Sequence, residues 1–174
     1  MLRIRCTLAI CLKGINQMGK GPKDIKVCFA ASSGGHLEQL LALKPLMNRY
    51  NSFILTEKTA YGAKLPVRSC YVHQVNRHEA TFLWRMILNT VKSIRYWLAE
   101  RPDVIVCTGV LATVPFCLIG HALGAKLVYI ESFAKTNSPT MTGKLLSKYA
   151  DRFYVQWETM LSVYPGARYV GGVY

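Results

Sequence analysis

Short apolar runs alternate with longer stretches of helical periodicity along most of this chain. This alternation is typical of a parallel sheet covered by helices. We predict strands over residues 26–30, 52–56, 70–75, 104–107, 126–130, 152–155 and 168–170, and helices over residues 37–49, 79–100, 113–123, 142–149 and 158–163. The predicted fold class is therefore α/β, with a Rossmann-like parallel sheet flanked by helices.

Three loops that follow predicted strands contain residues suited to ligand binding. In such sheets, ligands bind beyond the carboxyl ends of the strands. The candidates are Ser32, Ser33, Gly34, Gly35 and His36 in the first loop, Thr108 and Gly109 in the second, and Glu131 and Ser132 in the third. Because these loops emerge at one edge of the sheet, we predict that their residues line one cleft.

The first loop has the composition of an anion-binding turn. Its glycines let the backbone approach a ligand, and the next helix offers free N–H groups to a phosphate. The loop lacks the Gly-x-Gly-x-x-Gly and Gly-Lys-Ser/Thr signatures, which argues against dinucleotide-binding and P-loop proteins. A tight turn capped by Ser32 or Ser33 is the structural alternative, but His36 at the helix start favours function. Glu131 either orients a sugar hydroxyl, holds His36 or caps the segment after it.

The predicted helix over residues 79–100 combines an apolar stripe with aromatic and basic side chains. The stripe has helical spacing, which predicts a face packed on the sheet. The side chains around it are Trp84, Arg85, Lys92, Arg95 and Trp97. Indoles and cations also suit a membrane interface, where they meet headgroups and anionic lipid. Since opposite faces of a helix can serve different purposes, we predict both contacts.

Composition restricts the class of partner. The chain has 174 residues and is 51% hydrophobic, which suits one domain over residues 26–174. Residues 1–25 read as a basic N-terminal extension and a candidate membrane contact. A net charge of +13 implies an anionic partner. The six cysteines lack Cys-x-x-Cys spacing, so we expect reduced core thiols and no metal site.

Four ordered segments make the sequence recognisable. Residues 27–37, 102–109, 129–135 and 150–157 together resemble the accessory subunits of bacterial exopolysaccharide and capsule glycosyltransferases. That family is similar to the membrane-recruiting subunit of the eukaryotic two-component enzyme that adds the second N-acetylglucosamine to dolichol-linked sugar. The Gly-rich turn ending in His36 also resembles the N-terminal domain of MurG-like GT-B enzymes.

The resemblance implies a divided GT-B glycosyltransferase in which this chain is the N-terminal, acceptor-side half. A separate small glycosyltransferase subunit would bind the UDP-sugar donor, so this chain would bind no cofactor and be inactive alone. Gly34, Gly35 and His36 would face the diphosphate and reacting hydroxyl of a polyprenyl-diphosphate-linked acceptor. His36 is then the candidate base, and Glu131 is a second catalytic candidate in a flanking loop.

The same resemblance implies a location and a partner surface. The sequence departs from the eukaryotic members of the family in showing no N-terminal transmembrane helix. We therefore expect peripheral attachment to the cytoplasmic face of the inner (plasma) membrane through the helix with tryptophan and arginine. Residues 164–174, with three tyrosines and few charges, would contribute an exposed apolar surface for the second subunit.

Two other classes of function compete with this hypothesis. A stand-alone nucleotide-sugar-dependent enzyme, such as a transferase or epimerase, needs a nucleotide-binding signature that the sequence lacks. A basic nucleic-acid-binding module needs interleaved aromatic and basic recognition residues, which are also lacking, so we expect no nucleic acid partner. The favoured function is a subunit of a UDP-sugar glycosyltransferase in exopolysaccharide or capsule biosynthesis.

Overall fold

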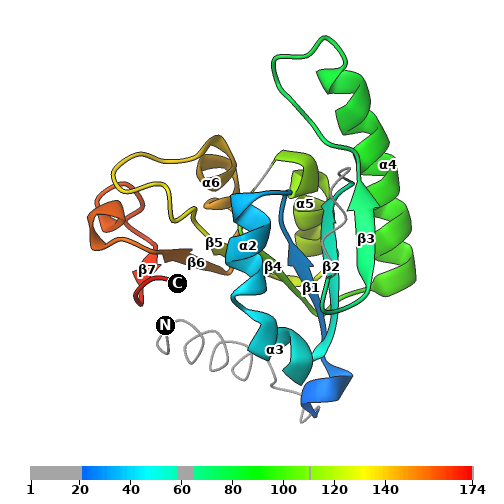
Figure 1. Cartoon of the computed structure of the whole chain (residues 1–174), viewed down its shortest axis with the longest axis horizontal. Helices are drawn as coiled ribbons and strands as arrows, with labels where there is room; N and C mark the ends of the chain where they lie inside the picture. The colour runs from blue at the N-terminus through cyan, green and yellow to red at the C-terminus, as the bar shows by residue number, and fades with distance from the viewer. Residues whose placement is uncertain (1–20, 59–64, 110, 174) are drawn as a thin grey trace.

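Seven parallel strands form a single sheet in a computed structural model that describes residues 21–58, 65–109 and 111–173 (Figure 1). The strands are β1 (Lys26–Ala30), β2 (Asn51–Glu57), β3 (Ser69–Val72), β4 (Val104–Cys107), β5 (Lys126–Ile130), β6 (Arg152–Val155) and β7 (Arg168–Tyr169). Their order is β3-β2-β1-β4-β5-β6-β7. The order reverses between β1 and β4, which is where doubly wound sheets bind ligands.

Helices cover both faces of this sheet (Figure 1). They are η1 (Pro22–Asp24), α2 (Gly35–Leu41), α3 (Lys44–Arg49), α4 (Phe82–Glu100), η2 (Leu111–Thr113), α5 (Val114–Ala122), α6 (Met141–Leu146) and η3 (Glu158–Leu161). Buried residues of α2 and α3 pack with one set of strand side chains, and those of α4, α5 and α6 with the other. Within β1, Cys28 and Phe29 belong to opposite cores, as the alternation of side chains along a strand requires.

The predicted fold class is confirmed, with differences at several elements. The predicted helix over 37–49 is two helices because Pro45, in the first turn of α3, cannot continue a helix from the preceding turn. Strand β3 ends at Val72 instead of residue 75 because the side chain of Asn89 takes the backbone N–H and carbonyl of His73. The segment predicted as a helix over 158–163 is the short 3₁₀ helix η3.

Four cysteines in the described part of the chain are free and buried, as predicted: Cys28, Cys70, Cys107 and Cys117. Burial raises the pKa of the Cys28 thiol well above its ordinary value, so the thiol stays protonated in the core. Cys6 and Cys11 lie outside the described residues, as does most of the predicted N-terminal extension.

Helix α4 turns its apolar side away from the sheet. Six side chains form what we call the α4 face, and each is at least 45% exposed: Leu83, Trp84, Ile87, Val91, Ile94 and Leu98. The buried residues of the helix are instead Asn89, Ser93, Trp97 and Glu100. The prediction that the apolar stripe packs on the sheet is therefore wrong.

The buried side of α4 tolerates polar residues because other elements supply their partners. Asn89 bonds to both backbone groups of His73, at 2.8 and 2.9 Å. Glu100 accepts from Lys26 Nζ at 2.8 Å and from Arg68. Satisfied polar groups lose little on burial, so they leave the apolar residues of α4 free to face outward.

Candidate active site

Two loops at the switch point are joined by a reciprocal pair of hydrogen bonds. His36 Nδ1 lies 2.9 Å from the carbonyl oxygen of Thr108, and Thr108 Oγ1 donates to the carbonyl oxygen of His36 at 3.1 Å. The loops after β1 and β4 therefore meet as predicted. The two contacts fix both the backbone and the imidazole ring of His36.

The contact with Thr108 also determines where a neutral His36 ring carries its proton. A carbonyl oxygen only accepts hydrogen bonds, so Nδ1 must be the donor. The lone pair of the neutral ring then lies on Nε2. The half-buried ring thus has one nitrogen tied to the protein and the other able to accept a proton from a hydroxyl group.

Gly109 permits the close approach of His36 to the second loop. Its φ of +108° lies in the region that favours glycine, and a Cβ there would lie 3.4 Å from His36 Cε1 and 3.3 Å from the Tyr129 hydroxyl. On the other side, Gly34 and Gly35 are exposed, and a Cβ at either would have no neighbour within 4 Å. The glycines therefore leave space for a ligand beside His36.

The serines of the first loop bond within the protein. Glu57, at the end of β2 and 5% exposed, accepts from Ser33 N at 3.4 Å and from Ser33 Oγ at 3.2 Å. Ser32 Oγ donates to the carbonyl of Ser33. Ser32 and Ser33, predicted to bind the acceptor or its phosphate, thus already have partners within the protein. These contacts also place a carboxylate directly behind the loop, and Gly34, not a serine, is the N-cap of α2.

The carboxylate of Glu131 is fully buried and does not line the cleft, contrary to prediction. It accepts from Ser132 N at 2.8 Å, from Thr140 Oγ1 at 2.9 Å and from the Tyr164 hydroxyl at 2.7 Å. Burial, reinforced by this carboxylate, raises the pKa of both Tyr129 and Tyr164, which therefore stay protonated as donors. Of the three roles considered, these contacts fit capping of the following segment.

Two buried glutamines bond to the third loop. They were not predicted as site residues from the sequence. Gln39 of α2 and Gln156 after β6 both donate to the carbonyl oxygen of Glu131, at 3.3 and 2.8 Å. Gln39 also accepts from Phe133 N, and Gln156 accepts from Val173 N. The available signal was a polar residue at the border of an apolar run, as for Gln156 directly after Val155. This signal was weak for Gln39, which follows the polar Glu38, and for Glu57, which follows Thr56.

The residues predicted to contact a membrane divide into two groups. Trp84 and Arg95 are exposed, and Arg85 and Lys92 are half-buried on the side of α4 that bonds to the chain at and after β3. Trp97, by contrast, is 8% exposed and packs against Phe116, so its predicted membrane contact is wrong. No helix in the described ranges has both the length and the apolar character needed to cross a bilayer.

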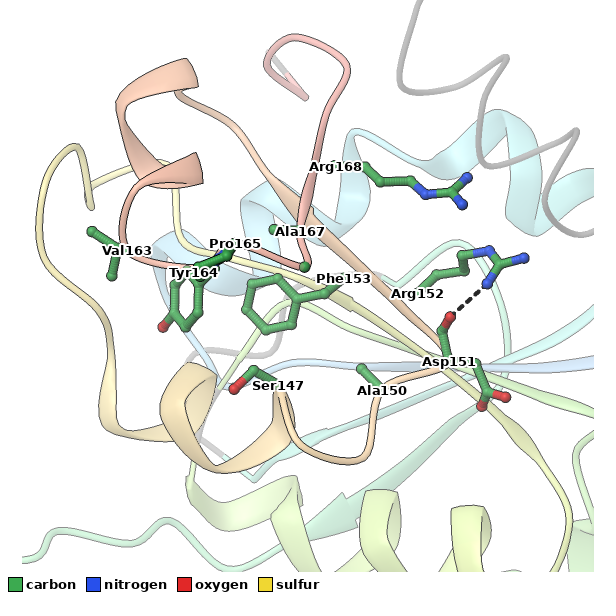
Figure 2. Close-up of a pocket in the computed structure, with 11 residues that line it drawn as sticks. Ser147, Ala150, Asp151, Arg152, Phe153, Val163, Tyr164, Pro165, Ala167 and Arg168 are labelled. Carbon is green, nitrogen blue, oxygen red and sulfur yellow. Dashed lines mark hydrogen bonds between the residues drawn. The ribbon is translucent and has the colours of Figure 1, made fainter.

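A cleft lies between the turns that precede β6 and β7, and Figure 2 shows the residues that line it. Its volume is about 360 Å³. Phe153 and Tyr164 pack together inside it, with ring centroids 4.6 Å apart. Because most of its lining precedes β6 and β7, it opens away from the carboxyl edge where His36 lies. Tyr164 and Val173 are buried, so the predicted apolar surface over residues 164–174 is wrong at these two positions, while Tyr169 is exposed.

Known proteins share the fold and the sequence pattern. The chain superposes on MurG of Acinetobacter baumannii with a TM-score of 0.68 and 19% identity, over 85% of this chain and 45% of that one. A UDP-N-acetylglucosamine 2-epimerase of Rickettsia bellii gives 0.65 and 12%, over 86% and 45%. At these identities the likeness shows the fold alone, and the chain spans less than half of either structure.

Curated relatives are named as transferase subunits. The human protein "UDP-N-acetylglucosamine transferase subunit ALG14" is 26% identical over 91% of this chain and 88% of its own length. The Schizosaccharomyces pombe subunit is 44% identical over 40% of this chain, and the match spans only 36% of that protein. The family model described as "Oligosaccharide biosynthesis protein Alg14 like" matches residues 56–173. This chain therefore belongs to the Alg14-like family.

Proposed function

We propose that this chain is the acceptor-binding, membrane-associated subunit of a two-component UDP-sugar glycosyltransferase. Membership of the Alg14-like family supports this, as do relatives named as subunits of a UDP-N-acetylglucosamine transferase. Because those relatives are named as subunits, a separate small subunit is the expected UDP-sugar-binding half. The motif resemblance further suggests exopolysaccharide or capsule biosynthesis as the setting.

The observation that carries the proposal is the fixed ring of His36. With Nδ1 bonded to Thr108, Nε2 accepts the proton of the acceptor hydroxyl as its oxygen attacks the anomeric carbon of the donor sugar. The new C–O bond forms while the bond to UDP breaks, and UDP leaves with that electron pair. Groups on the partner subunit would stabilise the departing diphosphate.

The α4 face supports attachment to a membrane. Single exposed apolar side chains are normal on a soluble protein, but six in one row form a continuous apolar patch. Arg95 is exposed at the border of this row, where it can meet anionic headgroups. We place this face on the cytoplasmic leaflet of the inner membrane, with the lipid-linked, polyprenyl-diphosphate acceptor in the same leaflet.

Reconstitution tests the division of labour between the subunits. Sugar transfer from UDP-N-acetylglucosamine to a polyprenyl-diphosphate sugar is measured in membranes that hold this chain, a candidate donor-binding subunit, or both. We expect transfer only with both. Transfer by this chain alone would contradict the divided enzyme, and transfer by the other subunit alone would contradict the acceptor-binding role.

Replacing His36 tests the chemistry. In the reconstituted pair, we expect His36→Gln to lower kcat by about 10²–10⁴ with a smaller change in KM for the acceptor, because the variant lacks the base. Turnover is compared with that of Glu38→Gln, an exposed position on the same helix. An unchanged kcat in the His36 variant would remove His36 from the mechanism.

A further inference from the structure

A second cleft lies at the carboxyl edge of the sheet, the edge that also holds His36. It has a volume of about 470 Å³ and is formed by the loop after β3, by η2 and by the start of α6. Its lining includes Asn76, Arg77, His78, Leu111, Met141 and Thr142. We call it the Arg77 cleft.

The Arg77 cleft lies between the two surfaces that the proposed function uses. Leu111 lies two positions after Gly109, where an added Cβ would lie 3.4 Å from His36 Cε1. The opposite wall belongs to the loop that leads into α4, where Leu83 and Trp84 begin the α4 face. Figure 1 shows this loop rising past the carboxyl end of β3. A ligand that extends from His36 to the α4 face would therefore pass through the cleft.

The charge of the cleft is positive. Arg77 is exposed, donates from Nε to His78 Nε2 at 3.2 Å, and contacts the sulfur of Met141 across the cleft through Nη1. Neither contact is with an acid: the nearby Glu79 pairs with Arg85 at 3.2 Å, and the buried Glu57 accepts from Val75 N at 3.3 Å. A guanidinium held in this way suits the bidentate binding of phosphate oxygens.

The Gly-rich loop is a weaker anion site than its composition suggests. The N–H and hydroxyl groups of Ser33 already donate to Glu57, and the carboxylate of Glu57 would repel a phosphate placed above it. An anionic group next to a sugar bound at His36 therefore gains more from the Arg77 cleft.

We propose that the Arg77 cleft binds the diphosphate of the acceptor, a diphosphate ester of a long apolar chain. This inference rests on the proposed function, because it assumes an acceptor whose sugar lies at His36 and whose chain lies on the α4 face. Arg77 contacts the phosphate oxygens, and His78 supports the guanidinium.

Binding of soluble probes to the purified full chain tests the cleft without the partner or turnover. Farnesyl diphosphate and farnesol are titrated by calorimetry, with inorganic pyrophosphate as competitor. We expect the wild-type protein to prefer the diphosphate, pyrophosphate to compete, and Arg77→Gln to weaken diphosphate binding about 10-fold or more. The matched control is Arg168→Gln, an exposed arginine at the opposite edge of the sheet.

Several outcomes would contradict the proposal that the Arg77 cleft binds the diphosphate. These are equal affinity for the diphosphate and the alcohol, unchanged affinity in Arg77→Gln, or a greater loss in Ser33→Ala than in Arg77→Gln. Arg77→Lys, which keeps the charge and loses the bidentate geometry, replaces the glutamine variant if the latter unfolds, and we expect weakened binding. A failed reconstitution with intact Arg77-dependent binding would refute the transferase function and leave the cleft standing. An active pair with no diphosphate preference would do the reverse.

Discussion

Three buried polar side chains at the carboxyl edge of the sheet hold the loops in which the site residues lie. Glu57 bonds to the Gly-rich loop, Gln39 joins α2 to the loop after β5, and Glu131 joins that loop to the segment before α6 and to Tyr164. None of these side chains needs a ligand to be satisfied. The candidate base is thus positioned by a frame that exists before substrate binds.

A substitution of Gly143 tests these buried contacts, because the Cα of Gly143 lies against Glu131 and its hydrogen-bond partners. A Cβ at this position would overlap Glu131 Oε2 and the Tyr164 hydroxyl. We predict that Gly143→Ala lowers the free energy of unfolding by about 2–4 kcal/mol, since the network must open to admit a methyl group. Urea denaturation measures this. The control is Gly166→Ala, where a Cβ has no neighbour within 4 Å, and an equal loss in both variants would contradict the prediction.

Glu100 makes stability depend on pH. Burial raises the pKa of this carboxyl, but the bonds from Lys26 and Arg68 outweigh it, so the pKa is lower than its ordinary value. A carboxylate whose pKa is lowered by folding adds stability above its unfolded pKa of about 4.3 and loses it as pH falls further.

We therefore predict that Glu100→Gln lowers the free energy of unfolding by about 1–3 kcal/mol at pH 7 and that its difference from the wild-type protein shrinks below about pH 4. Denaturation across this pH range measures the difference, with the exposed Glu158→Gln as control. A loss that stays constant at all pH values would show that the charge is not responsible.

The partners of these polar residues show which contacts of the site could be predicted from the sequence and which could not. His36, Thr108 and Gly109 were predictable as neighbours because they follow adjacent strands of one sheet. The hydrogen bonds that acids and serines make within the protein were not predictable, because their partners lie far apart in the sequence. Ser33 and Glu57 are 24 positions apart, and Glu131 and Tyr164 are 33 apart. Such pairs exist only after the strands have been placed.

At the scale of single elements, α4 packs against the protein mainly through polar residues and exposes its apolar side. Its buried side bonds to β1 and to residues around β3, and its apolar α4 face covers nothing in the described structure. The period of the stripe was predictable, but its direction was not. Local pattern favours burial of the apolar side, and only the distant partners of Asn89 and Glu100 reverse that preference.

The two tryptophans of α4 form a matched pair for testing this orientation. Trp84 is 63% exposed and Trp97 is 8% exposed. We predict that Trp84→Ala leaves the unfolding free energy within about 0.5 kcal/mol and weakens binding to lipid vesicles about 10-fold. Trp97→Ala should instead cost about 3–5 kcal/mol of stability with little effect on vesicle binding by the folded protein. Exchange of these two effects would show that the helix faces the other way.

At the scale of the whole molecule, the positive net charge and the α4 face both favour binding to an anionic membrane. With a net charge of +13, we predict that binding to vesicles with anionic lipid weakens as salt rises from about 0.05 to 0.5 M, because screening shortens the range of the attraction. Binding to vesicles of neutral lipid should be weaker and nearly independent of salt. Sedimentation of vesicles measures both, and salt-independent binding to anionic vesicles would contradict the prediction.

The architecture itself was largely predictable from the sequence. Central parallel strands are buried on both faces, so β1, β4 and β5 appear as continuous apolar runs with the expected bounds. Helix boundaries were less accurate where a single residue such as Pro45 or a side chain such as Asn89 ends an element. The α/β class followed from the alternation, and the contact between the His36 and Thr108 loops followed from the strand ends.

The direction of α4 has a consequence for how substrate arrives. The helix starts at the carboxyl edge of the sheet and ends at Glu100, beside Lys26 at the amino end of β1, so its axis runs alongside the strands. With the α4 face on a bilayer, the strands lie parallel to the surface and the carboxyl edge opens sideways along it. A lipid-borne acceptor would then enter by lateral diffusion within its own leaflet, so that enzyme and substrate search for each other in two dimensions.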